Sequence, residues 1–111
     1  SQLTAQAGRW LKHWNIDIIE THHIHKKDAP SGTALTLGQA AHGASGTEPN
    51  YHSLRCGDVV GEHTVQFAGI GERIELTHRA TNRDIFAQGA LFAAEKISTK
   101  MNGYYQFADL L

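Results

Sequence analysis

The chain has 111 residues, of which 41% are hydrophobic and 19% charged, values typical of a globular domain with one core and not of a disordered segment. Its formal net charge of −1 excludes the broad basic surface that binds nucleic acid or an acidic membrane. No apolar run is long enough to span a bilayer, and the single cysteine, Cys56, excludes a disulfide framework. A lone cysteine is typical of a reduced, cytoplasmic setting.

The first 30 residues predict a helix, a strand and a polar loop. Residues 3–12 can form a short amphipathic helix. Its apolar side chains fall on one side: Leu3, Ala7, Trp10 and Leu11. Residues 16–22 predict a strand whose partly contiguous apolar residues are typical of an inner position in a sheet. A polar loop follows over residues 23–30.

A second helix is predicted directly after this loop. Ser31 can cap it, and it runs from Gly32 to about His42 and ends at Gly43. One face of the helix carries Ala34, Leu37 and Ala41. Residues 43–50, rich in Gly, Ser, Thr and Pro, then predict a linker.

The second half predicts three strands and a long helix. Residues 51–55 form a short strand, and two runs of alternating apolar and polar residues on either side of Gly69–Gly71 are typical of a hairpin with one dry face. Asn82 can cap a final helix over residues 83–100. The stripe of this helix that we expect to be buried on the sheet contains Ile85, Phe86, Gly89, Ala90, Ala93 and Ile97.

The order helix, strand, helix, three strands, helix predicts an α+β fold with one mixed sheet of about four strands and helices packed on one face. The other face carries polar side chains at regular spacing, among them Thr64, Gln66, Arg73 and Glu75. Such a face is either solvated or used for oligomerisation, and the pattern alone leaves both open.

The stretch from Glu20 to Ala34 concentrates residues that bear chemistry, because it runs from a strand end through a polar loop into a helix start. The first turn of a helix has free N–H groups and attracts anions. Gly32 lets a ligand approach the backbone, and the hydroxyls of Ser31 and Thr33 add donors.

Histidines and lysines enter the same region from the strand side. Histidine titrates nearest neutral pH, which suits a proton donor, and Lys26 adds a positive charge close to His22. These groups together favour a pocket for a small, multiply anionic molecule, such as a dicarboxylate, with a proton source inside it.

Simpler explanations exist for the same residues. Ser31 can be only a helix cap, and His22, His23 and His25 could bind zinc, although the adjacent Lys26 would repel a cation. Neighbouring side chains on an extended segment also point to opposite sides. The alternative function is therefore a histidine-rich metal-binding or oligomerisation module without catalysis.

A second polar group follows later in the chain. Gly57 and Gly61 around a strand start are typical of a bend or bulge. Glu62 and His63 could brace the site from an adjacent strand.

The run from Glu20 to Ala34 resembles the signature of dihydrodipicolinate reductases, enzymes of lysine and diaminopimelate biosynthesis that reduce a cyclic dicarboxylate with NADH or NADPH. The pattern is a His-His pair, a Lys three positions after the second His, and then Asp-Ala-Pro-Ser-Gly-Thr-Ala. Residues 55–65 and 71–78 agree in order, as do Arg83 and residues 86–90.

The resemblance implies roles for individual residues. His22 would be the general acid that protonates a ring carbon after hydride arrives at its neighbour, and Lys26 would be the second catalytic group, donating a proton or stabilising negative charge. His23 would contact a substrate carboxylate. Gly32 and Thr33 would hold a carboxylate at the helix start.

The resemblance also implies partners. Arg83 and Phe86 would lie beside the cofactor, while the family's N-terminal dinucleotide-binding domain, with its Gly-rich phosphate turn, is absent from these 111 residues. We expect residues 1–111 to be the C-terminal substrate-binding and tetramerisation domain of a cytoplasmic homotetramer. We expect this piece alone to be inactive, to bind no metal, and to bind no cofactor stably.

Overall fold

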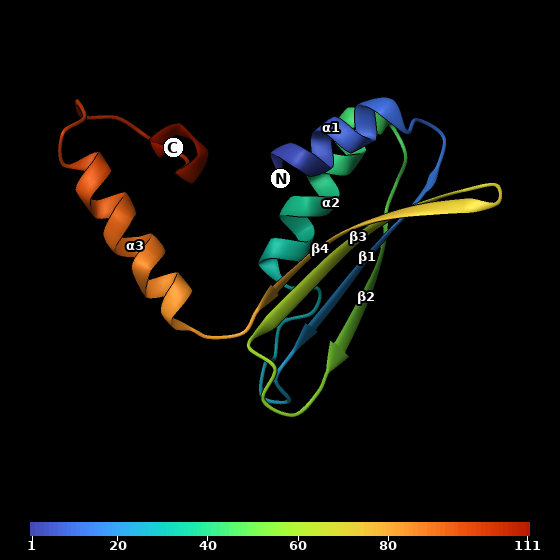
Figure 1. Cartoon of the computed structure of the whole chain (residues 1–111), viewed down its shortest axis with the longest axis horizontal. Helices are drawn as coiled ribbons and strands as arrows, with labels where there is room; N and C mark the ends of the chain where they lie inside the picture. The colour runs from blue at the N-terminus through green and yellow to red at the C-terminus, as the bar shows by residue number, and fades with distance from the viewer. The chain divides into compact units, whose positions relative to one another are not determined.

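A four-stranded mixed sheet forms the centre of residues 1–81, the first of two units in the computed structural model, which describes all 111 residues (Figure 1). Its strands are β1 (Asn15–His22), β2 (Asn50–Arg55), β3 (Gly61–Gly69) and β4 (Glu72–Ala80). Their order is β2-β1-β3-β4, with β1 and β2 parallel and the other pairs antiparallel. A parallel pair needs a crossover connection, which here contains α2 (Gly32–Ser45).

Two helices, α1 (Gln2–Trp10) and α2, lie on the same side of the sheet (Figure 1). The core between α2 and the sheet consists of Ile16, Ile18, Ala34, Ala41, Val65 and Phe67. The approach is close at Gly38, where an added Cβ would lie 1.9 Å from the Tyr51 hydroxyl oxygen. The predicted α+β fold, with its four-stranded mixed sheet and one helix-covered face, is confirmed.

The apolar side predicted for α1 is covered only in part, because Ala7 and Leu11 pack against the core but the other two residues do not. Leu3 and Trp10 are 76% and 74% exposed, and the buried residues of the helix are Thr4 and Gly8. The reason is that α1 packs on α2 through small residues, since a Cβ at Gly8 would lie only 3.1 Å from the carbonyl oxygen of Ala41.

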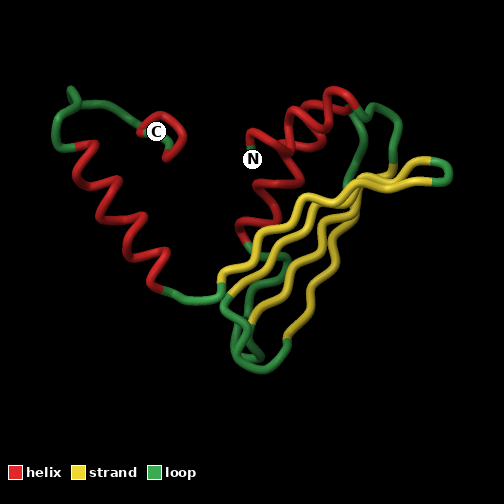
Figure 2. The backbone as a smooth tube through the Cα atoms, in the orientation of Figure 1, coloured by secondary structure: helices red, strands yellow, loops and turns green.

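Element ends also differ from the sequence pattern in places. Helix α2 continues through Gly43 to Ser45 and ends at Gly46, whose φ of 79° is left-handed and whose N–H donates to the carbonyl of His42 at 2.7 Å. The predicted hairpin between β3 and β4 is present, and it turns at Gly71 with φ 80° (Figure 2).

The sheet has a helix-covered face and a face that we call the outer face. Because neighbouring strands pair in register, the outer face can be traced across the sheet, and it includes Asp17, Ile19, Thr21, His52, Glu62, Thr64, Gln66, Arg73, Glu75, Thr77 and Arg79. Polar contacts on this face join different strands, with His52 Nε2 2.7 Å from Asp17 Oδ1 and Arg79 Nε 3.5 Å from Glu62 Oε2. The four polar residues predicted for the non-core face all lie on it.

Residues 82–111 form the second unit, with α3 (Asp84–Ile97) and a short 3₁₀ helix, η1 (Phe107–Leu110). Asn82 Oδ1 accepts a hydrogen bond from Asp84 N at 2.8 Å, close to the predicted cap. Within this unit α3 has no buried residue, and Ile85 and Phe86 are exposed, so the stripe predicted to be buried finds no cover inside residues 82–111. A unit of this size with one regular helix has too little chain to bury a stripe by itself. No helix in either unit has both the length and the apolar character that a membrane span needs.

Candidate functional site

His22 ends β1 and points into the helix-covered side of the sheet, on the same face as Ile16 and Ile18. Its Nδ1 lies 2.5 Å from Glu20 Oε2. Its ring also makes a T-shaped contact with His63 of β3, with 5.1 Å between the ring centroids. The predicted acid is therefore a buried side chain with partners and not a surface histidine.

Glu20 is the residue that sequence reasoning missed. Its side chain is 1% exposed, and the Arg55 guanidinium donates to both of its oxygens at 2.9 and 3.0 Å. The backbone N–H of Ser31 donates to Oε1 at 3.2 Å. Burial raises the pKa of Glu20, but hydrogen bonds from Arg55, Ser53 and His22 outweigh burial and hold the pKa at about 2. The carboxylate is therefore negatively charged at neutral pH.

Arg55, at the end of β2, connects Glu20 to the loop that carries Lys26. Its Nε donates to the carbonyl of Lys26 at 3.2 Å, and one Nη donates to the carbonyl of Asp28 at 2.7 Å. The other Nη donates to the carbonyl of Leu54 at 2.8 Å. With its two bonds to Glu20, all five N–H groups of the guanidinium have acceptors.

Ser31 both caps α2 and contacts a histidine of the site. Its Oγ accepts from Ala34 N at 3.2 Å, which makes it the predicted cap of α2, and the same oxygen lies 3.0 Å from His63 Nε2. Burial, and after it the nearby His22, lowers the pKa of His63. Of the two residues predicted to support the site from the adjacent strand, His63 contacts it. Glu62 does not, because it lies on the outer face beside Arg79.

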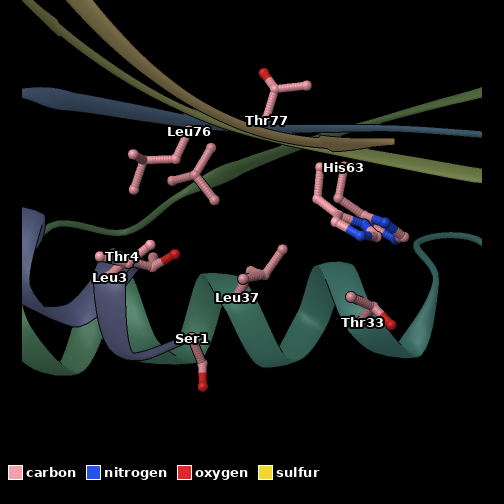
Figure 3. A pocket seen from close by; sticks show the side chains of 10 residues that line it. Ser1, Leu3, Thr4, Thr33, Leu37, His63, Leu76 and Thr77 are labelled. Atoms are coloured by element: carbon pink, nitrogen blue, oxygen red, sulfur yellow. The ribbon is translucent and has the colours of Figure 1, made fainter. Parts of the chain in front are cut away.

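Gly32 and Thr33 stand exposed at the first turn of α2. Their backbone N–H groups have no acceptor in the chain, whereas the next two, of Ala34 and Leu35, bond to Ser31. A cavity of about 350 Å³ lies beside this helix start. At one end it is lined by Thr33 and by His63, whose side chain points from the sheet toward α2 (Figure 3). From there it continues along apolar side chains of α2, β3 and β4. The side chains of His22 and Lys26 do not line this cavity.

The polar loop holds the remaining candidates. Lys26 Nζ lies 2.9 Å from Asp28 Oδ1, and this hydrogen bond lowers the pKa of Asp28. His23 Nδ1 accepts from the backbone N–H of His25 at 3.2 Å. No three His, Cys, Asp or Glu side chains gather as a metal ion would require.

The predicted site residues thus differ in how the structure places them. Buried hydrogen bonds through Glu20 and Arg55 connect His22, the start of α2 and the backbone of Lys26. Arg83 and Phe86 belong to the second unit, where Arg83 occupies the N-cap position of α3 and Phe86 is exposed.

The signal for Glu20 was present in the sequence. Ile16, Ile18, Glu20 and His22 occupy alternate positions of one strand, so a carboxylate on the core face required a buried partner. Arg55 could not be identified in this way, because its position depends on the parallel register that pairs it with His22.

Residues 1–111 match the family model described as dihydrodipicolinate reductase, C-terminus. The 4-hydroxy-tetrahydrodipicolinate reductase of Xanthomonas axonopodis pv. citri (strain 306) is 61% identical over 111 residues, which are 100% of this chain and 46% of that protein. The enzyme of that name from Stenotrophomonas maltophilia (strain K279a) is 62% identical over 110 residues, 99% of this chain and 46% of that protein.

The chain therefore spans less than half the length of these curated relatives. Among solved structures, a dipicolinate-bound dihydrodipicolinate reductase from Paenisporosarcina sp. TG-14 has a TM-score of 0.80 at 23% identity. The match covers 99% of this chain and 49% of that one, and it shows that the two share a fold.

Proposed function

The chain belongs to the family of dihydrodipicolinate reductase C-terminal domains, and we propose that it is the substrate-binding and tetramerisation domain of an NAD(P)H-dependent reductase of lysine and diaminopimelate biosynthesis. The observation that carries the proposal is the start of α2. There, two backbone N–H groups without acceptors, of Gly32 and Thr33, lie beside the buried network of His22. Such an arrangement suits an anionic substrate that must receive a proton.

Carboxylate binding is assigned to the helix start. The amides of Gly32 and Thr33 point out of the first turn, where the helix dipole favours negative charge. His23, on the loop before the helix, contacts a substrate carboxylate. Lys26 is bonded to Asp28 in the free chain, so a dicarboxylate competes with Asp28 for the ammonium group.

Proton transfer is assigned to His22, with Lys26 as the second catalytic group. A bound nicotinamide cofactor, NADH or NADPH, supplies the hydride. His22 protonates the ring carbon beside the one that receives the hydride, and Lys26 donates a proton or stabilises the developing negative charge.

Cofactor contact and assembly complete the proposal. Arg83 and Phe86 are exposed near the start of α3, and a cation and an aromatic ring are suitable neighbours for a dinucleotide. No Gly-rich turn between a strand and a helix occurs in the 111 residues, so we expect stable cofactor binding and turnover only together with a dinucleotide-binding domain. The outer face of the sheet is the surface that we assign to a homotetramer.

The test is a titration of the chain with dipicolinate, followed by amide NMR and calorimetry, with benzoate as a probe that carries one carboxylate. We expect saturable shifts at the amides of Gly32 and Thr33. Lys26→Met should weaken binding about tenfold or more, because a charge-assisted hydrogen bond contributes about 1.5–3 kcal/mol.

Lys12→Met is the matched control, since Lys12 is an exposed lysine just after α1. It should leave the affinity unchanged. Saturable binding without shifts at Gly32 and Thr33, or an equal loss in both lysine variants, would contradict the proposed site.

A further inference from the structure

The carboxylate of Glu20 has no unused acceptor position. Oε1 accepts from Ser31 N at 3.2 Å and from an Arg55 Nη at 3.0 Å. Oε2 accepts from the other Nη at 2.9 Å and lies 2.5 Å from His22 Nδ1. A carboxylate has about four lone-pair positions, which these four contacts suffice to occupy, and a hydrogen bond with Ser53 adds to them.

These contacts determine which ring nitrogen of His22 carries a proton. An ionised carboxylate only accepts hydrogen bonds, so Nδ1 must be the donor toward Glu20. The other nitrogen, Nε2, faces Gly61, where an added Cβ would lie 3.2 Å away. The φ of Gly61 is not in the left-handed region, so a side chain there would be opposed by the close approach of the ring and not by the backbone conformation.

We infer that Glu20 is a positioning residue, which holds His22 with its proton on Nδ1 and so makes Nε2 the nitrogen that exchanges a proton with the substrate. Arg55 holds Glu20 in place and joins it to the backbone of the loop that carries Lys26. The inference rests on the proposed function only in the assignment of substrate contact to His22. The state of the ring itself is a separate, measurable property.

The charges around the ring agree with this assignment. The pKa of Glu20, at about 2, keeps the carboxylate ionised throughout the physiological range. Burial lowers the pKa of His63, which disfavours a positive charge on the ring next to His22. A lysine in place of Arg55 could not reproduce the five bonds, because an ammonium group has three donors and no planar fork.

The substitution Glu20→Gln tests the inference, because the amide must present its NH₂ group at one of the two oxygen positions. At the Oε1 position the NH₂ group would meet two donors, Ser31 N and Arg55 Nη. At the Oε2 position it meets one Arg55 donor and can itself donate to His22 Nδ1. We therefore expect the neutral ring of His22 to change from the Nδ1–H to the Nε2–H tautomer.

The measurement is long-range ¹H–¹⁵N correlation NMR of the chain labelled at histidine nitrogens, at a pH where the ring is neutral, with His22 assigned from the His22→Gln spectrum. The original chain should show Nδ1 protonated, and Glu20→Gln should show Nε2 protonated. The control Glu62→Gln changes a carboxylate on the outer face and should leave the His22 signals as they were. If Glu20→Gln does not fold, the tautomer in the original chain decides: Nδ1–H supports the inference and Nε2–H overturns it.

Addition of dipicolinate separates this inference from the proposed function. We expect the Nε2 resonance of His22 to move while its Nδ1 proton remains. Binding that removes the Nδ1 proton, or an unchanged tautomer in a folded Glu20→Gln variant, would overturn the role of Glu20. If dipicolinate does not bind at all, the proposed function fails, while the tautomer result still stands or falls by itself.

Discussion

The two faces of the sheet each carry a glutamate–arginine pair, and the pairs differ in almost everything except residue type. On the helix-covered face, Glu20 and Arg55 are 1% and 20% exposed and form two hydrogen bonds at 2.9 and 3.0 Å. On the outer face, Glu62 and Arg79 are 37% and 64% exposed, and their closest atoms are 3.5 Å apart. Burial and the number of bonds therefore distinguish a charge that organises a site from a charge that is solvated.

The difference has an energetic reason. Removing one partner of a buried pair leaves an uncompensated charge in a medium of low polarity, whereas an exposed pair is screened by water and salt. A buried ion pair is stable only if the remaining polar atoms of both side chains also have hydrogen-bond partners. In this chain no buried side-chain polar atom lacks such a partner.

The largest effect is expected from Arg55→Met. Glu20 would remain buried without its cation, and the loop carbonyls of Lys26 and Asp28 would lose their donor. We expect the free energy of unfolding to fall by about 3–5 kcal/mol, measured by urea denaturation. The matched variant on the outer face is Arg79→Met. A similar loss in both variants would mean that burial does not separate the two pairs.

Acid pH should weaken the buried pair next. The folded-state pKa of Glu20, about 2, lies below its ordinary value of 4.5. Its contribution is therefore fully present above the unfolded pKa and is lost as the pH falls from about 5 through about 2, a change of about 3 kcal/mol in the free energy of unfolding. Urea titrations at several pH values should show this slope in the original chain and a smaller one in Glu20→Gln. Equal slopes would assign the acid sensitivity to other carboxylates.

An added methyl group should distinguish the two sides of α2. Gly38→Ala places a Cβ 1.9 Å from the Tyr51 hydroxyl oxygen, so Tyr51 or the helix must move, at a cost of about 1–3 kcal/mol. Gly43→Ala is the control in the same helix, because nothing lies within 4 Å of its Cβ and alanine favours a helix by about 1 kcal/mol. Thermal unfolding should show opposite signs for the two variants. Stabilisation by both would show that α2 can shift on the sheet.

The sequence predicted the order of elements and the helix-covered sheet because strand alternation and helix caps are local signals. It also placed His22 and the start of α2 in one region, because only ten residues separate His22 from Thr33. The contact between His63 and Ser31 joins residues 32 positions apart. Because such a contact depends on how the strands pair, the sequence suggested only that His63 could support the site. Only half of the apolar side predicted for α1 packs on the core, and the stripe of α3 has no cover within its own unit, because apolar spacing gives the most hydrophobic side of a helix, which is not always the side that packs.

The smallest effect is expected on the outer face, from Glu62→Gln. In the single chain the nearest Arg79 nitrogen is 3.5 Å away and both side chains reach solvent. At a protein concentration low enough to dissociate the homotetramer proposed above, the loss should therefore be below about 0.5 kcal/mol in the free energy of unfolding. Raising the salt concentration should reduce even that difference, since salt screens exposed charges and barely reaches buried ones. The measurement is urea denaturation at low and high salt, with Glu20→Gln alongside. A loss of 2 kcal/mol or more is about the size expected at a buried site. It would show that another surface covers the outer face under the conditions used, so that both pairs are buried in the assembled protein.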